Sequence, residues 1–508
     1  MFNKVALVTL PSQELERPPA APAVLGGICR HMGIEYSVFD INLRLAQRLS
    51  AEDFAEASDY WRTAHDRRLP QRVFEEFDIV IDDIIAQGYD LVAVSVFSKF
   101  STRATRLFVE RFRPMSTTMV VAGGQGLTTP YTNKRFGEWL LEQKLADHVA
   151  WGDGEVIWQN WMQGNFVVAG ADDMQPVQID DLESIPPADF TKLDPWKYFY
   201  NQTAGIYLTA SRGCVRKCTF CDVPHRWPKY KYRRGESMAN EMLLHWKETK
   251  VQLFQFTDSV INGNLKEFKQ LNQSISQLKI SNPGFDPRWL SQFNIRKAKD
   301  MPEEFYQLMS ASGAKMLITG VEHASWPVRQ HMGKEFDDDD LDHHIRMCGK
   351  HGIQNVFLMF IGYPTETLAD HKKQLKFLRR YQRYMQAGTI ALIRWGYTGS
   401  IDRGSLLESK DLGFKLVPEW PDLQMEHLED HDRDWVYGRN WINLNNPTLT
   451  LKERLRRRLE VHELSAELGY PITKGTEELK ILKIIAEQLI AGTTASPDKS
   501  LLISAEEH

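Results

Sequence analysis

Cysteine is scarce in this sequence, with five residues among 508. Two of them, Cys29 and Cys348, stand alone, so the disulfide framework of small secreted domains is excluded and a reducing compartment is expected. Long apolar runs are also missing: none approaches the roughly 20 residues that cross a bilayer. The opening apolar run at residues 5–10 is too short for a secretory signal. We therefore expect a cytoplasmic protein without a membrane partner.

An excess of basic charge is absent as well. The chain has 62 Lys and Arg against 67 Asp and Glu, a formal net charge of -5. Proteins that bind nucleic acid normally present a basic face, so a nucleic-acid partner is not expected. The sequence also has no internal repeat and no low-complexity segment. What is present, 42% hydrophobic and 25% charged residues, is the composition of a globular chain with two or three domains.

The first third of the chain alternates strand and helix patterns. Short apolar runs predict strands at residues 5–10, 35–43, 90–98, 117–124 and 148–155, and apolar residues at helical spacing predict helices such as 21–33 and 75–86. This alternation predicts the α/β class, with a doubly wound parallel sheet of the Rossmann-like type over residues 1–165.

Ligands of such sheets bind at the carboxyl ends of the strands. The candidate binding residues at these ends are Ser95, Gly123, Gly124, Gly154 and Glu155. The stretch GGQG that begins at Gly123 is not G-x-G-x-x-G, so a tight turn after a strand remains the alternative interpretation.

A polar, proline-bearing linker at residues 166–200 precedes a second series of strand patterns. Six strands are predicted at residues 205–211, 253–259, 289–295, 316–322, 356–362 and 389–395. Helical patterns between them predict a (β/α)6 partial TIM barrel over residues 201–400, with its chemistry at the carboxyl ends of the strands. Residues 401–508 predict a helical C-terminal domain, including helices at 451–469 and 478–492, and we expect its arginine run to be a solvated helix face.

Three of the five cysteines lie close together in the stretch SRGCVRKCTFC. Cys214, Cys218 and Cys221 have the spacing C-x3-C-x2-C and follow the first barrel strand directly. Three thiolates on one loop indicate a metal site, since a disulfide needs only two. Zinc is one candidate, with His225 as a fourth ligand. Structural zinc sites usually collect two pairs of ligands from separate knuckles, whereas an iron–sulfur cluster on three cysteines leaves one iron open, and the spacing favours the cluster.

The stretch RGCVRKCTFC resembles the signature of the radical S-adenosylmethionine (SAM) enzymes. The resemblance extends through most of the barrel, because four further residues match the family's motifs on the second to fifth strands: Asp258 in QFTDSVINGN, Arg296 in FNIR, Glu322 in TGVEHAS and Gly362 in FIGYPTET. On their residue types alone, Asp258 and Glu322 fit a capping or ion-paired role equally well, and Arg296 fits a structural salt bridge.

The resemblance implies a site and a reaction. A 4Fe-4S cluster on the three cysteines would chelate SAM through its open iron, and Phe220 would place its backbone against the adenine. An electron from a donor such as flavodoxin or ferredoxin would then cleave SAM to a 5′-deoxyadenosyl radical.

The front domain resembles the cobalamin-binding (B12-binding) domain that precedes the barrel in B12-dependent radical SAM enzymes. The resemblance covers residues 19–42, 90–98, 120–126, 146–156 and 182–190. It implies that Ser95 bonds the nucleotide tail, that Gly123 and Gly124 let the tail pass, and that Gly154 and Glu155 lie near the corrin. The D-x-H-x-x-G element, which supplies a histidine below cobalt in other B12 proteins, is absent, so the lower axial ligand is unassigned.

Three functions are compatible with this sequence. The leading hypothesis is a cobalamin-dependent methyltransferase that acts on an unactivated carbon of a small-molecule substrate. The second is a radical SAM enzyme of another reaction type, such as rearrangement or oxidation, with a front domain that no longer binds cobalamin. The third is a non-catalytic zinc or iron–sulfur protein. No residue pattern indicates which substrate is used.

Overall fold

The computed structural model describes residues 2–11, 14–63, 68–132, 134–166, 177–198, 203–395, 407, 414–416 and 441–471. The chain divides into two compact units. The first contains Met1–Leu208 and Lys231–Gln255, and the second contains Thr209–Tyr230 and the described chain from Phe256 onward.

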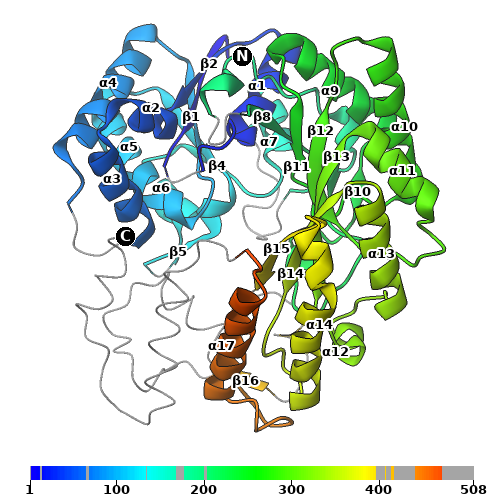
Figure 1. The fold of residues 1–508 in the computed structure, drawn as a ribbon. Coiled ribbons are helices and arrows are strands. Elements are labelled where there is room, and N and C mark those ends of the chain that lie inside the picture. Colours follow the sequence, from blue (N-terminus) through cyan, green and yellow to red (C-terminus); the bar gives the residue numbers. More distant parts are fainter. Residues whose placement is uncertain are drawn as a thin grey trace. The chain divides into compact units, whose positions relative to one another are not determined.

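A five-stranded parallel sheet forms the centre of the first unit (Figure 1). Its strands are β1 (Lys4–Thr9), β2 (Glu35–Asp40), β3 (Leu91–Ser95), β4 (Met119–Gly123) and β7 (His148–Ala150), in the order β2-β1-β3-β4-β7. The neighbouring strands pair in parallel throughout. The chain therefore proceeds from β1 first to one side and then to the other, which confirms the predicted doubly wound sheet.

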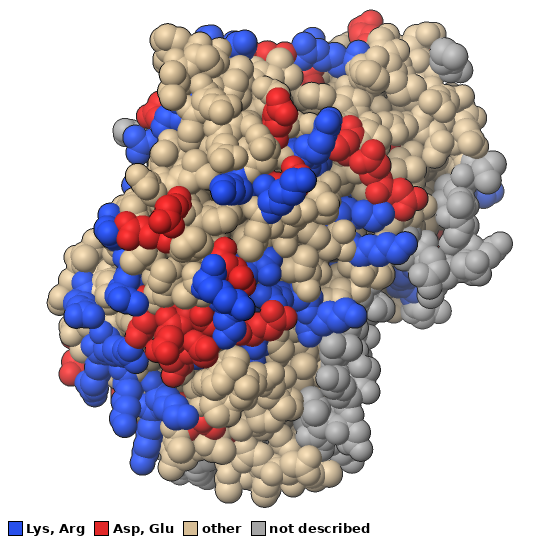
Figure 2. Space-filling model, turned by 90° about the vertical axis from the view of Figure 1, so that its right-hand side faces the viewer, with Lys and Arg blue, Asp and Glu red and all other residues tan. Residues whose placement is uncertain are grey.

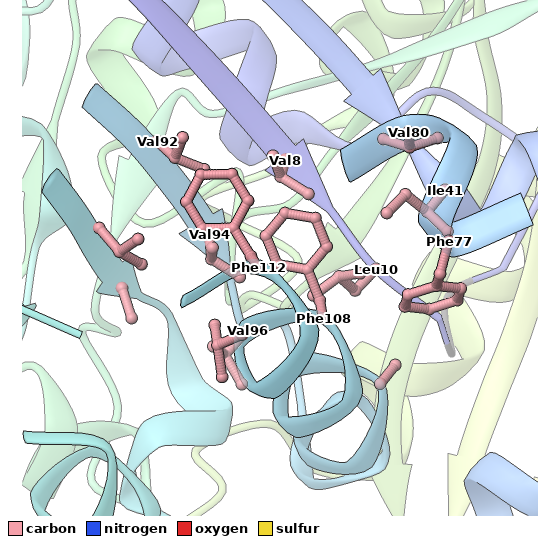
Figure 3. Packing of buried hydrophobic residues seen from close by; sticks show 14 of the residues in the cluster. Val8, Leu10, Ile41, Phe77, Val80, Val92, Val94, Val96, Phe108 and Phe112 are labelled. Atoms are coloured by element: carbon pink, nitrogen blue, oxygen red, sulfur yellow. The ribbon is translucent and has the colours of Figure 1, made fainter. Parts of the chain in front are cut away.

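Helices cover both faces of this sheet. One face packs against α1 (Ala20–Met32) and α7 (Gly154–Met162). The other packs against α2 (Ile41–Arg48), α3 (Ala51–Thr63), α4 (Gln71–Gln87), α5 (Thr102–Phe112) and α6 (Phe136–Glu142). In β1, Leu7 packs on the face covered by α1 and α7. Val8 packs on the opposite face, in the same hydrophobic cluster as Phe108 of α5 (Figure 3). Burial on both faces explains why the strand reads as a continuous apolar run.

The second sheet has six strands, as the βα spacing predicted. They are β8 (Gly205–Leu208), β11 (Leu253–Phe256), β12 (Arg288–Phe293), β13 (Ala314–Glu322), β14 (Gln354–Met359) and β15 (Ile390–Trp395), in the order β15-β14-β13-β12-β11-β8. The chain crosses between successive strands through α9 (Gly235–Thr249), α10 (Leu265–Ser281), α11 (Glu303–Ser312), α13 (Asp338–Lys350) and α14 (Leu368–Gln386). Sequential strand order with alternating helices confirms the partial (β/α) barrel.

The described part of the C-terminal region is only partly helical. Helix α17 (Leu451–Glu467) forms where the pattern predicted it, and the Thr450 side chain caps it by accepting from the Glu453 N–H. Strands β16 (Phe414–Leu416) and β17 (Trp441–Asn443) form an antiparallel pair that the pattern did not indicate. The expectation of a solvated arginine face is wrong for Arg454 and Arg457, which are 0% and 2% exposed. The helix predicted at 478–492 lies outside the described residues.

The surface is mixed in charge on the face shown in Figure 2, where Lys and Arg side chains are interspersed with Asp and Glu. In the ranges that the structure describes, no helix is both long and apolar enough to cross a membrane.

Candidate functional site

The three cysteines lie on one loop between β9 (Ser211–Arg212) and α8 (Val223–Arg226). Gly213 opens the loop with φ 78°, and a Cβ there would lie 2.7 Å from the Lys229 carbonyl oxygen, so the turn requires glycine. Within the loop, the Cys221 N–H donates to the Cys218 carbonyl at 3.1 Å, and the Arg216 N–H donates to Cys214 Sγ at 3.4 Å. Backbone contacts therefore shape the loop, and all three thiols are free of disulfides.

Thr219, between the second and third cysteines, fastens the loop to its surroundings. Its N–H donates to the Met332 carbonyl at 3.1 Å, and its carbonyl accepts from the Leu407 N–H at 2.7 Å. Its hydroxyl lies 2.7 Å from the Tyr363 hydroxyl, which in turn lies 2.9 Å from His331 Nδ1. The cysteine loop is thus held by residues that follow the fourth, fifth and sixth strands of the barrel.

Burial and nearby cations set the electrostatics of the thiols. Burial raises the pKa of Cys218, although the neighbouring Lys334 ammonium partly opposes the shift, and burial raises the pKa of Cys221 to about 12. Arg216 also contributes positive charge near Cys218. Thiols in such surroundings stay protonated until a metal displaces the proton, since a coordinating thiol is deprotonated by the ion itself.

Three cysteine thiols on one loop are a donor set that fits a cluster with one open iron. In the part of the chain that the structure describes, no three His, Cys, Asp or Glu side chains gather closely enough to hold one metal ion. A zinc ion would need its sulfur ligands about 2.3 Å from the metal, whereas a four-iron cluster is larger and its cysteines lie farther apart. The side chain of His225, the expected fourth zinc ligand, lies outside the described residues.

Asp258 lies just beyond β11 and is fully buried, with 1% of its surface exposed. Its Oδ2 accepts from the Ala210 N–H at 3.0 Å, at the start of the cysteine-bearing segment. Burial raises the pKa of this carboxyl to about 7, although hydrogen bonds from Ser211 and Ala210 lower it in part. In this structure Asp258 therefore fixes the backbone between β8 and β9, and it neither caps a helix nor forms an ion pair in the described ranges.

Arg296 follows β12 and also bonds to backbone. Its Nη2 donates to the Asn262 carbonyl at 2.6 Å and to the Gly263 carbonyl at 2.8 Å. Within the described ranges no carboxylate pairs with Arg296, so the structure does not support the interpretation of Arg296 as a salt-bridge residue. Its buried Nε has no hydrogen-bond partner there, and a bound group would satisfy that donor.

Glu322 ends β13 in a strained conformation, with φ 66°. The β13–β14 register shifts between Gly320 and Glu322, so the strand carries an extra residue at this point. The bulge aims the Glu322 carboxylate at Lys334, whose Nζ lies 2.9 Å away, and both side chains are more than 90% buried. Burial would lower the pKa of Lys334, but the charges of Glu322 and Cys218 outweigh it and raise the pKa.

Phe220 and Gly362 lie where the cysteine loop meets the end of β14. The Phe220 ring is 4.8 Å from the Phe360 ring, and Lys334 Nζ is 5.7 Å from the Phe220 ring. Gly362 has φ 76°, and a Cβ there would lie 2.7 Å from Arg454 Cγ of α17. The glycine is therefore required by its backbone conformation and by the packing of α17.

The candidate residues of the first unit line one edge of its sheet. The register pairs Ser95 with Gly123, and Gly123 with Ala150, so these carboxyl ends form one row. Gly124, with φ 116°, lies so close to the Val96 carbonyl that a Cβ would collide with it, whereas a Cβ at Gly123 would be 3.5 Å from Ala150 Cβ, an ordinary contact. The tight-turn interpretation thus explains Gly124 but not Gly123.

Gly154 and Glu155 begin α7 at the same edge, just beyond β7. A Cβ at Gly154 would meet nothing within 4 Å, so packing does not require glycine there. Glu155 is 8% exposed and lies in the first turn of the helix, where a carboxylate is favourable.

Sequence reasoning missed several residues that support the site. Lys334 pairs with Glu322, Tyr363 holds Thr219, and the fully buried Glu366 accepts from the Gly362 N–H at 2.6 Å. Arg457 of α17 pairs with Glu366 at 3.0 Å. The stretch FIGYPTET contains Tyr363 and Glu366, so this motif was the available signal for two of the four.

Comparisons with known proteins agree with this geometry. Residues 208–378 match the radical SAM superfamily. An uncharacterized methyltransferase from Pyrococcus horikoshii is 23% identical over 219 residues, which are 42% of this chain and 45% of that protein. The chain therefore spans less than half the length of this curated relative.

Two solved structures share the fold. The radical SAM methyltransferase TsrM from Kitasatospora setae, solved with cobalamin and a 4Fe-4S cluster bound, is 17% identical with a TM-score of 0.58, over 82% of this chain and 77% of that chain. The cobalamin-dependent SAM radical enzyme OxsB, solved with aqua-cobalamin and SAM bound, is 12% identical with a TM-score of 0.58, over 80% of this chain and 60% of that chain. At these identities the likeness concerns the fold.

Proposed function

We propose that this chain, whose residues 208–378 match the radical SAM superfamily, is a cobalamin-dependent methyltransferase acting on an unactivated carbon of a small molecule. One observation carries the proposal. The same chain contains a doubly wound sheet in the order β2-β1-β3-β4-β7 and, after it, a partial barrel with three cysteines beyond its first strand. TsrM and OxsB share this fold over about four-fifths of the chain.

The cofactors would divide the chemistry between them. When bound, a reduced 4Fe-4S cluster supplies the electron that cleaves SAM, and cobalamin supplies a methyl carrier. Cys214, Cys218 and Cys221 would hold the cluster. A small electron carrier of the flavodoxin or ferredoxin type would reduce it.

The proposed SAM-binding set is Phe220, Asp258, Arg296, Glu322 and Gly362. The geometry divides this set by role. Asp258 accepts a hydrogen bond from a backbone N–H group, and Arg296 donates to backbone carbonyl groups. Both residues would therefore position the loops at the strand ends. The carboxylate of Glu322, unlike that of Asp258, is paired with a buried cation, the ammonium of Lys334. The pair would offer both signs of charge to SAM, which carries an amino and a carboxylate group.

The proposed cobalamin site is the edge formed by Ser95, Gly123 and the N-terminus of α7 at Gly154 and Glu155. Gly123 supports this assignment because no neighbour in the described chain requires glycine there. Glycine admits the close approach of a ligand to the backbone.

The cluster is tested by replacing each cysteine separately. Cys214→Ala, Cys218→Ala and Cys221→Ala should each lose most of the iron and all cleavage of SAM to 5′-deoxyadenosine after anaerobic reconstitution. Cys29→Ala and Cys348→Ala are matched controls, because both thiols are fully buried on helices α1 and α13, outside the cysteine loop, and should keep wild-type iron. Near-normal SAM cleavage by any loop variant would contradict the radical reaction.

The cobalamin-dependent reaction is tested on the wild type. Reconstitution with hydroxocobalamin should give about one cobalt per chain and a corrin absorbance, and a reaction with SAM carrying a deuterated methyl group should transfer the label to a small molecule in a cell extract. Iron and SAM cleavage without cobalt would instead indicate a radical SAM enzyme of another reaction type. Zinc in place of iron would indicate the non-catalytic alternative.

A further inference from the structure

The two faces of strands β12 to β15 have different surroundings. Phe293, Phe357 and Ile393 point outward and are buried beneath the barrel helices. Successive residues of a strand point to opposite faces. The side chains of Leu358 and Arg394 therefore lie on the inner face, where Leu358 is half-buried and Arg394 is exposed.

The register places Arg394 in a row with Gly320, beside the ion pair at the end of β13. Gly320 pairs with Leu358, and Leu358 pairs with Arg394, so the three residues lie side by side across β13, β14 and β15. Glu322 and Lys334 lie directly over Gly320, since a Cβ at Gly320 would collide with the Glu322 carboxylate. Strands are about 4.8 Å apart, which puts the Arg394 backbone roughly 10 Å from that of Gly320.

Arg394 carries an unmatched charge on this face of the described strands, whereas Arg296, beyond the end of β12, bonds to backbone carbonyls. Glu322 and Lys334 neutralise each other at 2.9 Å, and Arg288, at the start of β12, lies 3.9 Å from Asp286. No carboxylate in the described ranges pairs with Arg394. Its row neighbour Leu358 is apolar, as is Phe360 beyond it. A guanidinium beside apolar side chains binds carboxylate and phosphate groups strongly, through two parallel hydrogen bonds.

The geometry points to Arg394 as the anchor for an anionic group of the methyl acceptor, an inference that rests on the proposed methyltransferase function. The acceptor is a small organic acid or phosphate ester whose apolar part lies along Leu358 and Phe360. Its reacting end extends toward the Glu322–Lys334 pair, whose strand β13 lies two strand spacings from β15. Under the proposed function the open iron of the cluster would bind SAM, so Arg394 is assigned to the second molecule.

The test uses three probes that share an apolar body and differ in the head group: 4-phenylbutyrate, 3-phenylpropyl phosphate and neutral 4-phenylbutanamide. Calorimetric titration into the reconstituted, SAM-loaded wild type should show at least one anion binding about tenfold more tightly than the amide. Whether the carboxylate or the phosphate binds more tightly identifies the head group. In Arg394→Gln the preference for the anions over the amide should fall below twofold. Arg394→Lys should keep part of this preference. Arg379→Gln, which removes an exposed arginine from α14, should behave as the wild type.

Three results would overturn the inference. The wild type could bind the amide as tightly as both anions, or Arg394→Gln could keep the full preference. A fall in SAM affinity in Arg394→Gln equal to the fall in anion affinity would make Arg394 a SAM contact instead. None of these measurements requires methyl transfer, whereas cobalt content and label transfer test the proposed function, so the two failures are distinguishable.

Discussion

Glu322 and Lys334 form an ion pair of 2.9 Å in which each side chain is more than 90% buried. The segment that carries Lys334 lies against the cysteine loop, because a Cβ at Gly333 would be 3.6 Å from Cys218 Cα. One ammonium thus compensates a buried carboxylate and adds positive charge beside a thiol of the proposed cluster. Removing either charge would leave the other buried without compensation.

Lys334→Met should therefore destabilise the protein by about 3 kcal/mol. The loss should be partly restored in the double variant Glu322→Gln/Lys334→Met, because the unpaired carboxylate is then gone. Lys315→Met, at an exposed position on β13, the strand of Glu322, should cost less than about 0.5 kcal/mol. Urea unfolding of the four proteins measures these differences, and equal losses in the single and double variants would refute the coupling.

Asp258 should make stability depend on pH. Its pKa is about 7 in the folded chain because burial disfavours the charged form, against about 3.9 when unfolded. Folding is therefore penalised progressively as pH rises from about 4 to 7, by up to about 4 kcal/mol, and the penalty is constant above that range. Asp258→Asn keeps an oxygen for the Ala210 N–H but cannot ionise. Its urea midpoint relative to the wild type should rise between pH 5 and pH 8, and a difference that does not change with pH would exclude this titration.

The sequence predicted the fold well where the pattern depends on neighbouring residues. Apolar runs such as residues 5–10 identify strands because both faces of a doubly wound sheet are buried, and glycine at position 213 marks the cysteine loop because its φ is positive. The cysteine spacing itself pointed to the family. These signals are local and can be read without knowing the tertiary structure.

The supporting contacts of the site could not be predicted in the same way. Glu366 and Arg457 are 91 residues apart, and the bulge that turns Glu322 toward Lys334 leaves no mark in the hydrophobic pattern. Long-range pairs of this kind depend on how the elements pack. For the same reason the arginines of α17 seemed solvated by composition, although Arg454 packs on Gly362.

Gly123 and Gly124 should respond differently to substitution. Gly124→Ala places a Cβ at φ 116° against the Val96 carbonyl and should cost about 2 kcal/mol or more. Gly123→Ala should cost little, because its Cβ meets only Ala150 at 3.5 Å. Gly123→Leu should lower bound cobalt without lowering bound iron if the proposed cobalamin tail passes there. The cobalt-to-iron ratio of the reconstituted variants measures this effect, and a wild-type ratio in Gly123→Leu would remove Gly123 from the cobalamin site.

Arg457 connects α17 to the loop that carries Gly362. Its Nη1 lies 3.0 Å from Oε1 of Glu366, whose Oε2 accepts from the Gly362 N–H at 2.6 Å. Burial would raise the pKa of Glu366, but His323 and Arg457 outweigh it and hold the pKa below its usual value. The carboxylate is therefore charged, fully buried and dependent on the guanidinium of Arg457.

Arg457→Met should leave Glu366 undercompensated and destabilise the protein by about 3 kcal/mol. Because Glu366 fixes the Gly362 backbone, SAM affinity measured by calorimetry should also fall, by about tenfold if one hydrogen-bonded contact is lost. Arg457→Lys should restore part of both. The matched control is Arg456→Met on the same helix, whose side chain is 43% exposed and pairs with Glu453 and Glu460; it should cost less than about 1 kcal/mol and leave SAM binding unchanged. Loss of stability in Arg457→Met with wild-type SAM affinity would mean that Arg457 anchors α17 without positioning the Gly362 loop.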